Sequence, residues 1–205
     1  MTRMLAVVCT LAMALVIFAG MAQAQTSPYR VDYFSNANTG GAPDATLRLD
    51  NDGSGAIPNG GNSVTSGGDI NLCADIYIFD SYEELSECCS CLETPDGLRT
   101  LSVNTNLTSN PLTGVVLSTG VIKIVAAETT GGACPVPTHI ALASNGEIQS
   151  WATHIQNSNF AITETASQVS NLSSAEQTAL AQQCGAIARV GSGKGICNCG
   201  TGTGS

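Results

Sequence analysis

The cysteines constrain the fold of this chain more than any other feature. Four of them lie between Leu72 and Asn104, where the sequence reads LCADIYIFDSYEELSECCSCLETPDGLRTLSVN. Without Cys9, which lies in the expected leader, their number is even, and an even number in a secreted chain predicts a disulfide framework. We expect four disulfides among Cys73, Cys88, Cys89, Cys91, Cys134, Cys184, Cys197 and Cys199. They should tie the cysteine block to the strand before it and to the C-terminal Cys184, Cys197 and Cys199.

A zinc site is the alternative for the same cysteines. Its ligands would come from Cys88-Cys89-x-Cys91 and Cys197-x-Cys199. Structural zinc sites prefer pairs of cysteines separated by two residues, and neither group has that spacing. We therefore predict disulfides, with no bound metal and no cofactor.

The first 24 residues read as a signal peptide. Arg3 supplies a positive start, Leu5 to Phe18 form an apolar core, and Ala22-Gln23-Ala24 matches a cleavage site. An N-terminal membrane anchor is the alternative, but the apolar core is short for a spanning helix. We expect a secreted protein at the cell surface or outside the cell, with no membrane span after cleavage.

The charge excludes one large class of partners. The net charge is −9, so the chain lacks the basic surface that binds a phosphate backbone, and we expect no nucleic acid partner. Charged residues make up only 11% of the sequence, and 22 glycines separate short apolar segments. This composition is typical of β-rich secreted proteins with neutral surfaces.

The pattern of short apolar segments predicts a mainly β protein. We expect one domain, a β-sandwich or jelly-roll-like fold with two small helices, over residues 46–199, preceded by an N-terminal strand and flexible linker (25–45) and followed by a flexible tail (200–205). One helix should run from the capping box at Ser81 to about Leu92, and the other from about Ser174 to Ala188. The predicted strands cover residues 29–34, 46–49, 72–79, 98–103, 112–117, 121–126, 139–143, 147–155 and 160–169.

One hairpin is predicted more strongly than the others. Asn145-Gly146 favours a type I′ turn, so the segments His139–Ala143 and Glu147–Ile155 should pair. This pairing would place His139 and His154 on opposite arms, within conceivable reach of one metal ion. The sequence offers no third ligand, so surface positions remain the simpler interpretation.

The N-terminal strand suggests how the protein assembles. Tyr29, Val31 and Tyr33 alternate on one face, and the linker Ser35–Ala45 is rich in Gly, Asn and Pro. Such a strand can join its own sheet, or it can be donated to the sheet of a neighbouring copy, which builds open-ended filaments. We favour donation and take Tyr29, Val31 and Tyr33 as the assembly strand.

No catalytic motif is present, and we expect no enzymatic activity. The segment Gly191-Ser192-Gly193-Lys194-Gly195 lacks the remaining residues of a phosphate loop. A hydrolase would have to use the glutamates of the cysteine block, which capping and solubility also explain; these are Glu83, Glu84, Glu87 and Glu93. Asn106 and Asn171 each begin an N-glycosylation pattern and are possible glycosylation sites.

Several blocks resemble a group of small secreted, cysteine-containing bacterial proteins of unknown function. They are LCADIYIFD, ECCSC, TPDGLRTLSVNTNLTSNPLTG and GICNC. The resemblance covers most of the chain after the leader but brings no catalytic residue with it. In organisation, the chain is also similar to pilus-like subunits that polymerise by donated strands.

These observations predict a structural role. We expect a secreted subunit that associates with itself into a filament or surface layer by exchange of the N-terminal strand. A carbohydrate- or surface-binding module is the alternative, for which Trp151 and four tyrosines could stack on sugars. A hydrolase is a weaker alternative.

Overall fold

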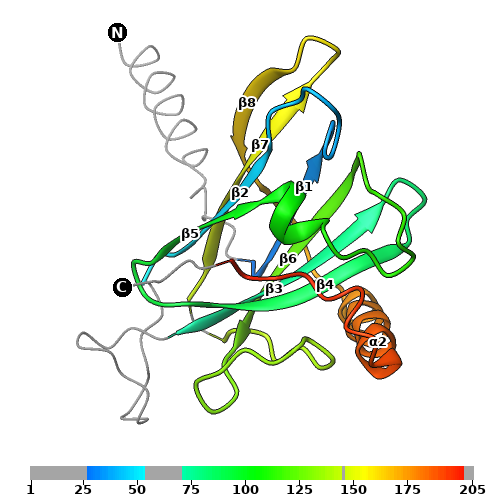
Figure 1. Cartoon of the computed structure of the whole chain (residues 1–205). Coiled ribbons are helices and arrows are strands. Elements are labelled where there is room, and N and C mark those ends of the chain that lie inside the picture. Colours follow the sequence, from blue (N-terminus) through cyan, green and yellow to red (C-terminus); the bar gives the residue numbers. More distant parts are fainter. Residues whose placement is uncertain (1–26, 54–70, 145, 201–205) are drawn as a thin grey trace, which may run out of the picture.

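Two antiparallel β-sheets packed face to face form the protein (Figure 1). The computed structural model describes residues 27–53, 71–144 and 146–200, so the expected signal peptide lies outside the described residues. One sheet has the order β4-β3-β6-β1-β9 and the other β5-β2-β7-β8. The strands are β1 (Tyr29–Phe34), β2 (Thr46–Asn51), β3 (Leu72–Asp80), β4 (Leu85–Glu93), β5 (Leu98–Ser102), β6 (Gly120–Glu128), β7 (Ile148–Gln156), β8 (Ala161–Ala166) and β9 (Gln168–Val169). The predicted mainly β sandwich is confirmed; its jelly-roll form is not.

Strand β3 shows why the five-stranded sheet is buried on both faces. Ile76 and Ile78 point toward the other sheet, while Cys73 and Tyr77 point to the opposite face and are equally inaccessible. A strand covered on both sides needs apolar residues at nearly every position, as LCADIYIFD has. The core therefore consists of two layers, one on each side of this sheet.

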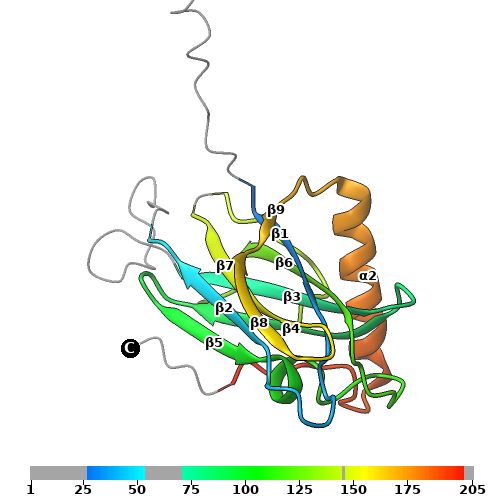
Figure 2. The same cartoon turned by 90° about the horizontal axis from the view of Figure 1, so that it is seen from above.

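The outer layer is closed by the helix α2 (Ser174–Val190), which lies against the outer face of the five-stranded sheet (Figure 2). Ser173 caps its start by accepting a hydrogen bond from the amide of Glu176, and Gly191 ends it with a left-handed φ of 67°. Leu180, Cys184 and Ile187 are its buried residues facing the sheet. The predicted second helix is thus confirmed.

The helix predicted in the cysteine block is wrong. Residues 85–93 form β4, which pairs with β3 along its whole length. The apparent capping box is instead a turn in which Asp80 Oδ1 accepts from the amides of Tyr82 and Glu84. Glu83 has a φ of 66°, which no helix can contain. The other described helix is a short π-helical turn, η1 (Val103–Leu107).

The predicted Asn-Gly hairpin is also wrong. The segment around Ala141–Ala143 pairs with the end of β6, through hydrogen bonds from Glu128 to Ala141 and from Ala143 to Ala126. Strand β7 pairs with β2 and β8 instead. Residues 112–117, predicted as a strand, contain none. In the C-terminal segment, Ile196 makes one bridge to β4.

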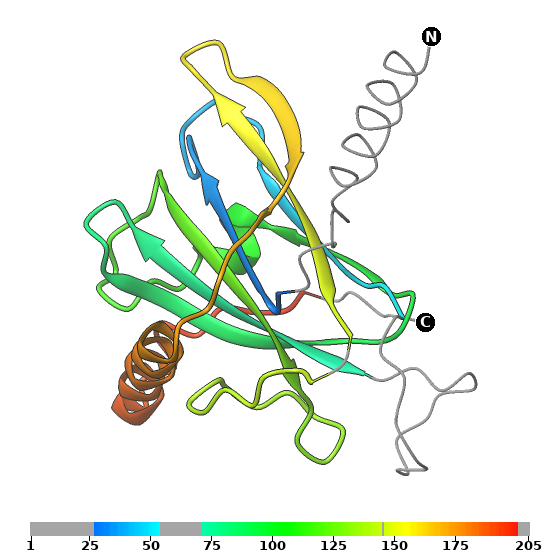
Figure 3. The same ribbon diagram turned by 180° about the vertical axis from the view of Figure 1, so that it is seen from behind.

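The two sheets are joined along both sides of the sandwich. On one side, the chain leaves β8 in the four-stranded sheet, passes Ser167 and enters β9 in the five-stranded sheet (Figure 3). On the other side, residues 195–199 run along the edge of β4, where Cys88 donates to Gly195 and Cys197 donates to Cys88. These two crossings hold the sheets in fixed relation.

Candidate functional site

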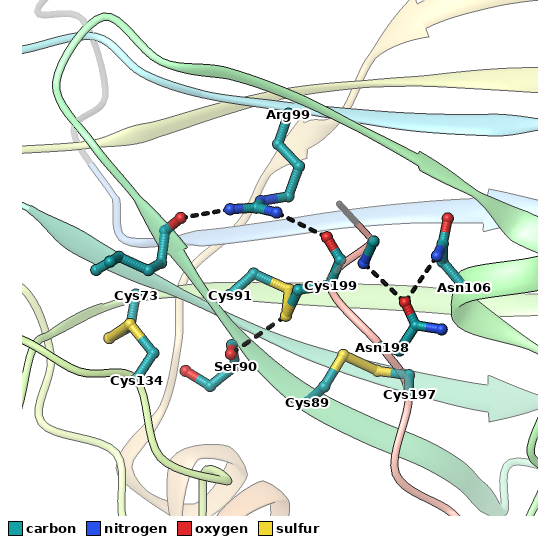
Figure 4. Close-up of a disulfide and its surroundings, with 12 residues drawn as sticks. Cys73, Cys89, Ser90, Cys91, Arg99, Asn106, Cys134, Cys197, Asn198 and Cys199 are labelled. Atoms are coloured by element: carbon teal, nitrogen blue, oxygen red, sulfur yellow. Dashed lines mark hydrogen bonds between the residues drawn. A yellow bond between two sulfur atoms is a disulfide. The ribbon is translucent and has the colours of Figure 1, made fainter. Parts of the chain in front are cut away.

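The cysteine block is a structural staple. Cys88 on β4 binds Cys184 of α2. In the C-terminal segment, Cys197 binds Cys89 and Cys199 binds Cys91 (Figure 4). The predicted disulfides from this block to the C-terminal cysteines are confirmed. The expected tie to the preceding strand is wrong, because Cys73 binds Cys134 in the loop after β6.

The disulfides also occupy the cysteines that were the alternative zinc ligands. The sulfur atoms of Cys89, Cys91 and Cys199 lie within 4.8 Å of one another, but each is part of a disulfide and offers no thiolate. Arg99 reinforces the staple, since its guanidinium donates to the carbonyl of Cys199 and to the carboxylate of Glu93, both at 2.6 Å. This part of the molecule holds the C-terminal segment in place.

The four glutamates of the block lie in different surroundings. Glu83 and Glu84 are exposed in the turn between β3 and β4, whereas Glu87 and Glu93 are buried on β4. Burial raises the pKa of Glu87 and of Glu93 to about 7, against the lowering effects of the Asn110 amide and of Arg99 respectively. Of these four glutamates, only Glu83 and Glu84 are therefore accessible to solvent.

The two histidines do not form the pair that the hairpin predicted. His154 is buried between the sheets, where Nδ1 donates to the carbonyl of Tyr33 at 3.1 Å. Its Nε2 lies 2.7 Å from the hydroxyl of Thr165 and 3.4 Å from Asp32. His139 is exposed beside a small hollow of about 120 Å³ on the outer face of the other sheet.

A buried carboxyl that the sequence did not point to lies in that hollow. Asp75 is only 3% exposed, and the hydroxyl of Ser90 donates to it at 2.5 Å. Burial raises the pKa of Asp75 to about 7, with the Ser90 hydrogen bond opposing the shift. Alternation within β3 could have placed Asp75 on the outer face, but its burial there depends on the loop after β6, which lines the same hollow.

The predicted assembly strand lies inside its own sheet. All six residues of β1 pair with β6, and Arg30 and Val31 also pair with β9. Tyr29 is buried, Val31 is half-buried and Tyr33 is 44% exposed. Arg30, which alternates with Tyr29 and Val31 along β1, points to the other face of the sheet and forms a buried ion pair with Glu147 at 3.0 Å.

The linker after β1 lies against the sandwich. Ala37 donates its amide to Ser118, and the side chain of Asn38 donates to the carbonyl of Leu117 and to Thr108. Ser35 and Asn36 both donate side-chain hydrogen bonds to the carbonyl of Ile155. Releasing β1 would therefore break contacts well beyond the strand itself.

Strand β8 is exposed along its whole length. Each of its six residues is exposed, and Ile162 is 61% exposed. It pairs with β7 on one side only and forms one edge of the four-stranded sheet. An unpaired edge of this kind offers backbone hydrogen-bonding groups to another strand.

The outer face of the four-stranded sheet is a second accessible surface. Strand register places Arg48 beside Trp151 and Thr46 beside Thr153, whose hydroxyls lie 2.9 Å apart. Arg48 forms an ion pair with Glu164 of β8. The half-buried Trp151 is thus surrounded by side chains that form hydrogen bonds.

The two possible glycosylation sites differ. Asn106 is half-buried, accepts from the amide of Ser102 and donates to Asn198, both at 2.8 Å (Figure 4). Asn171 is exposed before α2. A glycan on Asn106 would compete with the contact that holds the C-terminal segment.

Known proteins do not assign a function to this chain. A scan of protein-family models and searches of curated proteins and solved structures find no match. The resemblance to small secreted bacterial proteins therefore stays a prediction. Among the described residues, no helix is both long and apolar enough to cross a membrane. Four disulfides are typical of proteins that fold in an oxidising compartment.

Proposed function

We propose that the protein is a secreted structural subunit that associates with itself into an extracellular filament or surface layer. The observation that carries this proposal is the open edge of β8. Strand addition at such an edge provides affinity through backbone hydrogen bonds and does not require a preformed pocket. Four disulfides, and the connections that join the two sheets on both sides of the sandwich, provide the rigid body that a structural subunit needs.

Other sheet edges have neighbours that β8 lacks. Residues 195–199 run along β4, and the side chain of Asn106 accepts a hydrogen bond from the backbone amide of Ser102 at the end of β5. Strand β9 has only two residues. Natural β-proteins protect their edges in such ways because an unprotected edge recruits further strands. The six-residue edge of β8 is therefore the best place for a second chain to add.

The sequence of β8 suits this role. AITETA contains no Lys or Pro, the residues that commonly block strand addition. The amide of Ser167 donates to the carbonyl of Ser150 in β7, so the backbone groups of Ser167 face β7 and those of its neighbour Ala166 face away from it. Because alternate residues of a strand point their backbone groups to the same side, Ile162, Glu164 and Ala166 present theirs to the open edge.

The proposal moves the assembly contact away from β1. Donation of β1 would require its withdrawal from between β6 and β9, with loss of the buried pair between Arg30 and Glu147. A swapped strand would regain the same contacts in a neighbour, so exchange remains a second route to polymers. Addition at β8 needs no such withdrawal.

A disulfide lock separates the two routes. Val31 and Lys123 are directly opposite in the ladder between β1 and β6, so Val31→Cys/Lys123→Cys would tie β1 to its own sheet. We expect the locked protein to assemble as the wild type does in negative-stain electron microscopy. Loss of assembly in the locked protein, restored by reduction of that disulfide, would place the contact at β1 instead.

Glycan binding is a second candidate function, favoured by the position of Trp151. An indole on an open sheet face stacks on sugar rings, and Arg48, Glu164 and Thr153 could bind hydroxyl groups around it. A glycan array tests this function directly. Binding should disappear in Trp151→Ala and persist in Tyr82→Ala, which removes an 84% exposed aromatic side chain elsewhere. An array without hits removes this candidate.

A further inference from the structure

A groove runs along one side of α2, on the outer face of the five-stranded sheet. Two adjoining hollows of about 390 and 380 Å³ form it, and both are lined by Glu83 and Gln183. The helix contributes a single stripe of residues at helical spacing, from Glu176 to Val190. At 1.5 Å per residue, this stripe makes the groove about 21 Å long.

The floor of the groove is apolar and leaves room for side chains. Phe79 and Val121 line one half, and Leu85 and Leu112 line the other. The helix presents small residues there, Ala179 and Ala186, so little of the space is filled from that side. Val190 is 63% exposed at one end, which leaves an apolar side chain in contact with water.

The rim of the groove is acidic. Four carboxylates line it, those of Asp80, Glu83, Glu84 and Glu176. The cation that lines it, Lys123, is already bound to Glu176 at 2.5 Å and lies over the ring of Phe79. Three rim carboxylates have no cation among the residues that line the groove, so the groove is complementary to a segment that carries both apolar and positive side chains.

Three of these carboxylates, those of Asp80, Glu83 and Glu84, lie at the turn between β3 and β4, whose backbone is held by hydrogen bonds. Glu83 adopts a left-handed φ of 66° and donates its amide to the carbonyl of Asp80 at 3.2 Å. The Asp80 carboxylate accepts from the amide of Glu84 at 3.0 Å. A non-glycine residue in this conformation is strained, and strain retained in an exposed turn is common where a ligand is bound.

We propose that this groove binds a cationic amphipathic helix of another protein. Such helices dock into apolar grooves through residues at helical spacing, and about 14 residues of helix match the length of the groove. A second copy of this chain does not fit, because the chain has a net charge of −9 and would oppose the acidic rim. The proposal is independent of assembly at β8, which lies on the other sheet.

Titration with designed peptides tests the proposal. The probes are three fluorescent 15-residue peptides with helical spacing: one of Leu and Lys, one of Leu and Glu, and one of Ser and Lys. We expect only the Leu/Lys peptide to bind, with an affinity that falls as salt is added. Equal binding of the Ser/Lys peptide would show attraction by charge alone and would contradict an apolar groove.

Two variants locate the binding on the protein. Ala186→Phe should fill the groove, and Glu83→Gln/Glu84→Gln should weaken binding about fivefold by removal of two rim charges. The matched control is Glu128→Gln/Asp96→Asn, which removes the same charge from other exposed surfaces. Circular dichroism confirms that each variant is folded. If the control weakens binding as much as the rim variant does, or if Ala186→Phe binds as the wild type does, the groove is not the site.

Discussion

The hydroxyl of Ser167 donates a hydrogen bond of 2.7 Å to Oδ2 of Asp32, across the gap between the two sheets. Ser167 is the residue at which the chain passes from β8 to β9, and Asp32 is in β1. Both are buried, and Oδ1 of the same carboxylate lies 3.4 Å from His154. One carboxylate of β1 thus contacts both β7 and the connection between β8 and β9, at the side of the sandwich that ends in β8.

The first prediction concerns this contact. Ser167→Ala should lower the free energy of unfolding by about 2 kcal/mol, because a buried carboxylate loses a donor that water cannot replace. Urea denaturation measures the change. Thr100→Ala, on the exposed face of β5, is the control and should change stability by less than about 0.5 kcal/mol. Equal effects of the two substitutions would show that the contact contributes nothing specific.

The disulfides should contribute unequally to stability. Cys89–Cys197 and Cys91–Cys199 both span 108 residues, and their ends are only two residues apart on each side. When one is removed, the other still closes almost the same loop. Cys73–Cys134 closes a different loop of 61 residues, so its removal should cost about 4 kcal/mol by loop entropy.

Paired alanine variants test this inequality. We expect Cys91→Ala/Cys199→Ala to lose less than half of the stability that Cys73→Ala/Cys134→Ala loses, as measured by urea denaturation without reductant. The entropic account of these disulfides fails if the two variants are equally destabilised. Mass mapping of the remaining disulfides confirms that no new pairing has formed.

A pH dependence should follow from Asp75. Its pKa is raised to about 7 by burial, so between about pH 4 and 7 the folded protein holds a proton that the unfolded chain has released. The contribution of Asp75 to stability therefore falls as the pH rises through this range. Asp75→Asn should be more stable than the wild type at pH 8, by on the order of 2 kcal/mol, and equally stable at pH 4.

Denaturation at pH 4, 6 and 8 checks this difference. Glu128→Gln, which removes an exposed carboxylate, is the control and should leave the pH profile unchanged. Glu87 and Glu93 also have a pKa raised to about 7, so the wild-type profile contains their contributions as well. A gap between Asp75→Asn and the wild type that stays constant from pH 4 to pH 8 would contradict a raised pKa for Asp75.

The sequence predicted correctly those features that a single residue type determines locally, such as the ends of a helix. Ser173 and Gly191 mark the ends of α2 because a hydroxyl cap and a left-handed glycine each satisfy backbone groups locally. The cysteine count predicted disulfides for the same reason. The pairing of Cys73 with Cys134 depends on contacts 61 residues apart, which local patterns do not contain.

The errors have a common physical origin in tertiary contacts. Residues 85–93 follow the capping signal at Ser81, and they show no clear alternation because β4 is buried on both faces and anchored by disulfides. The segment after His139 has turn residues that fit a hairpin, but β6 competes for its backbone groups. The open edge of β8 could not be predicted either, since an edge is defined only once all the other strands have been placed.

Sedimentation velocity of Ile162→Pro tests the central claim most directly. Proline at this position removes an amide from the open edge of β8 and leaves the ladder to β7 intact. Ile162→Thr, which keeps the amide and the strand propensity, is the control. We predict that the wild type and Ile162→Thr form larger species as concentration rises, while Ile162→Pro stays a folded monomer. A wild type that remains monomeric, or a proline variant that assembles equally well, would contradict assembly at β8.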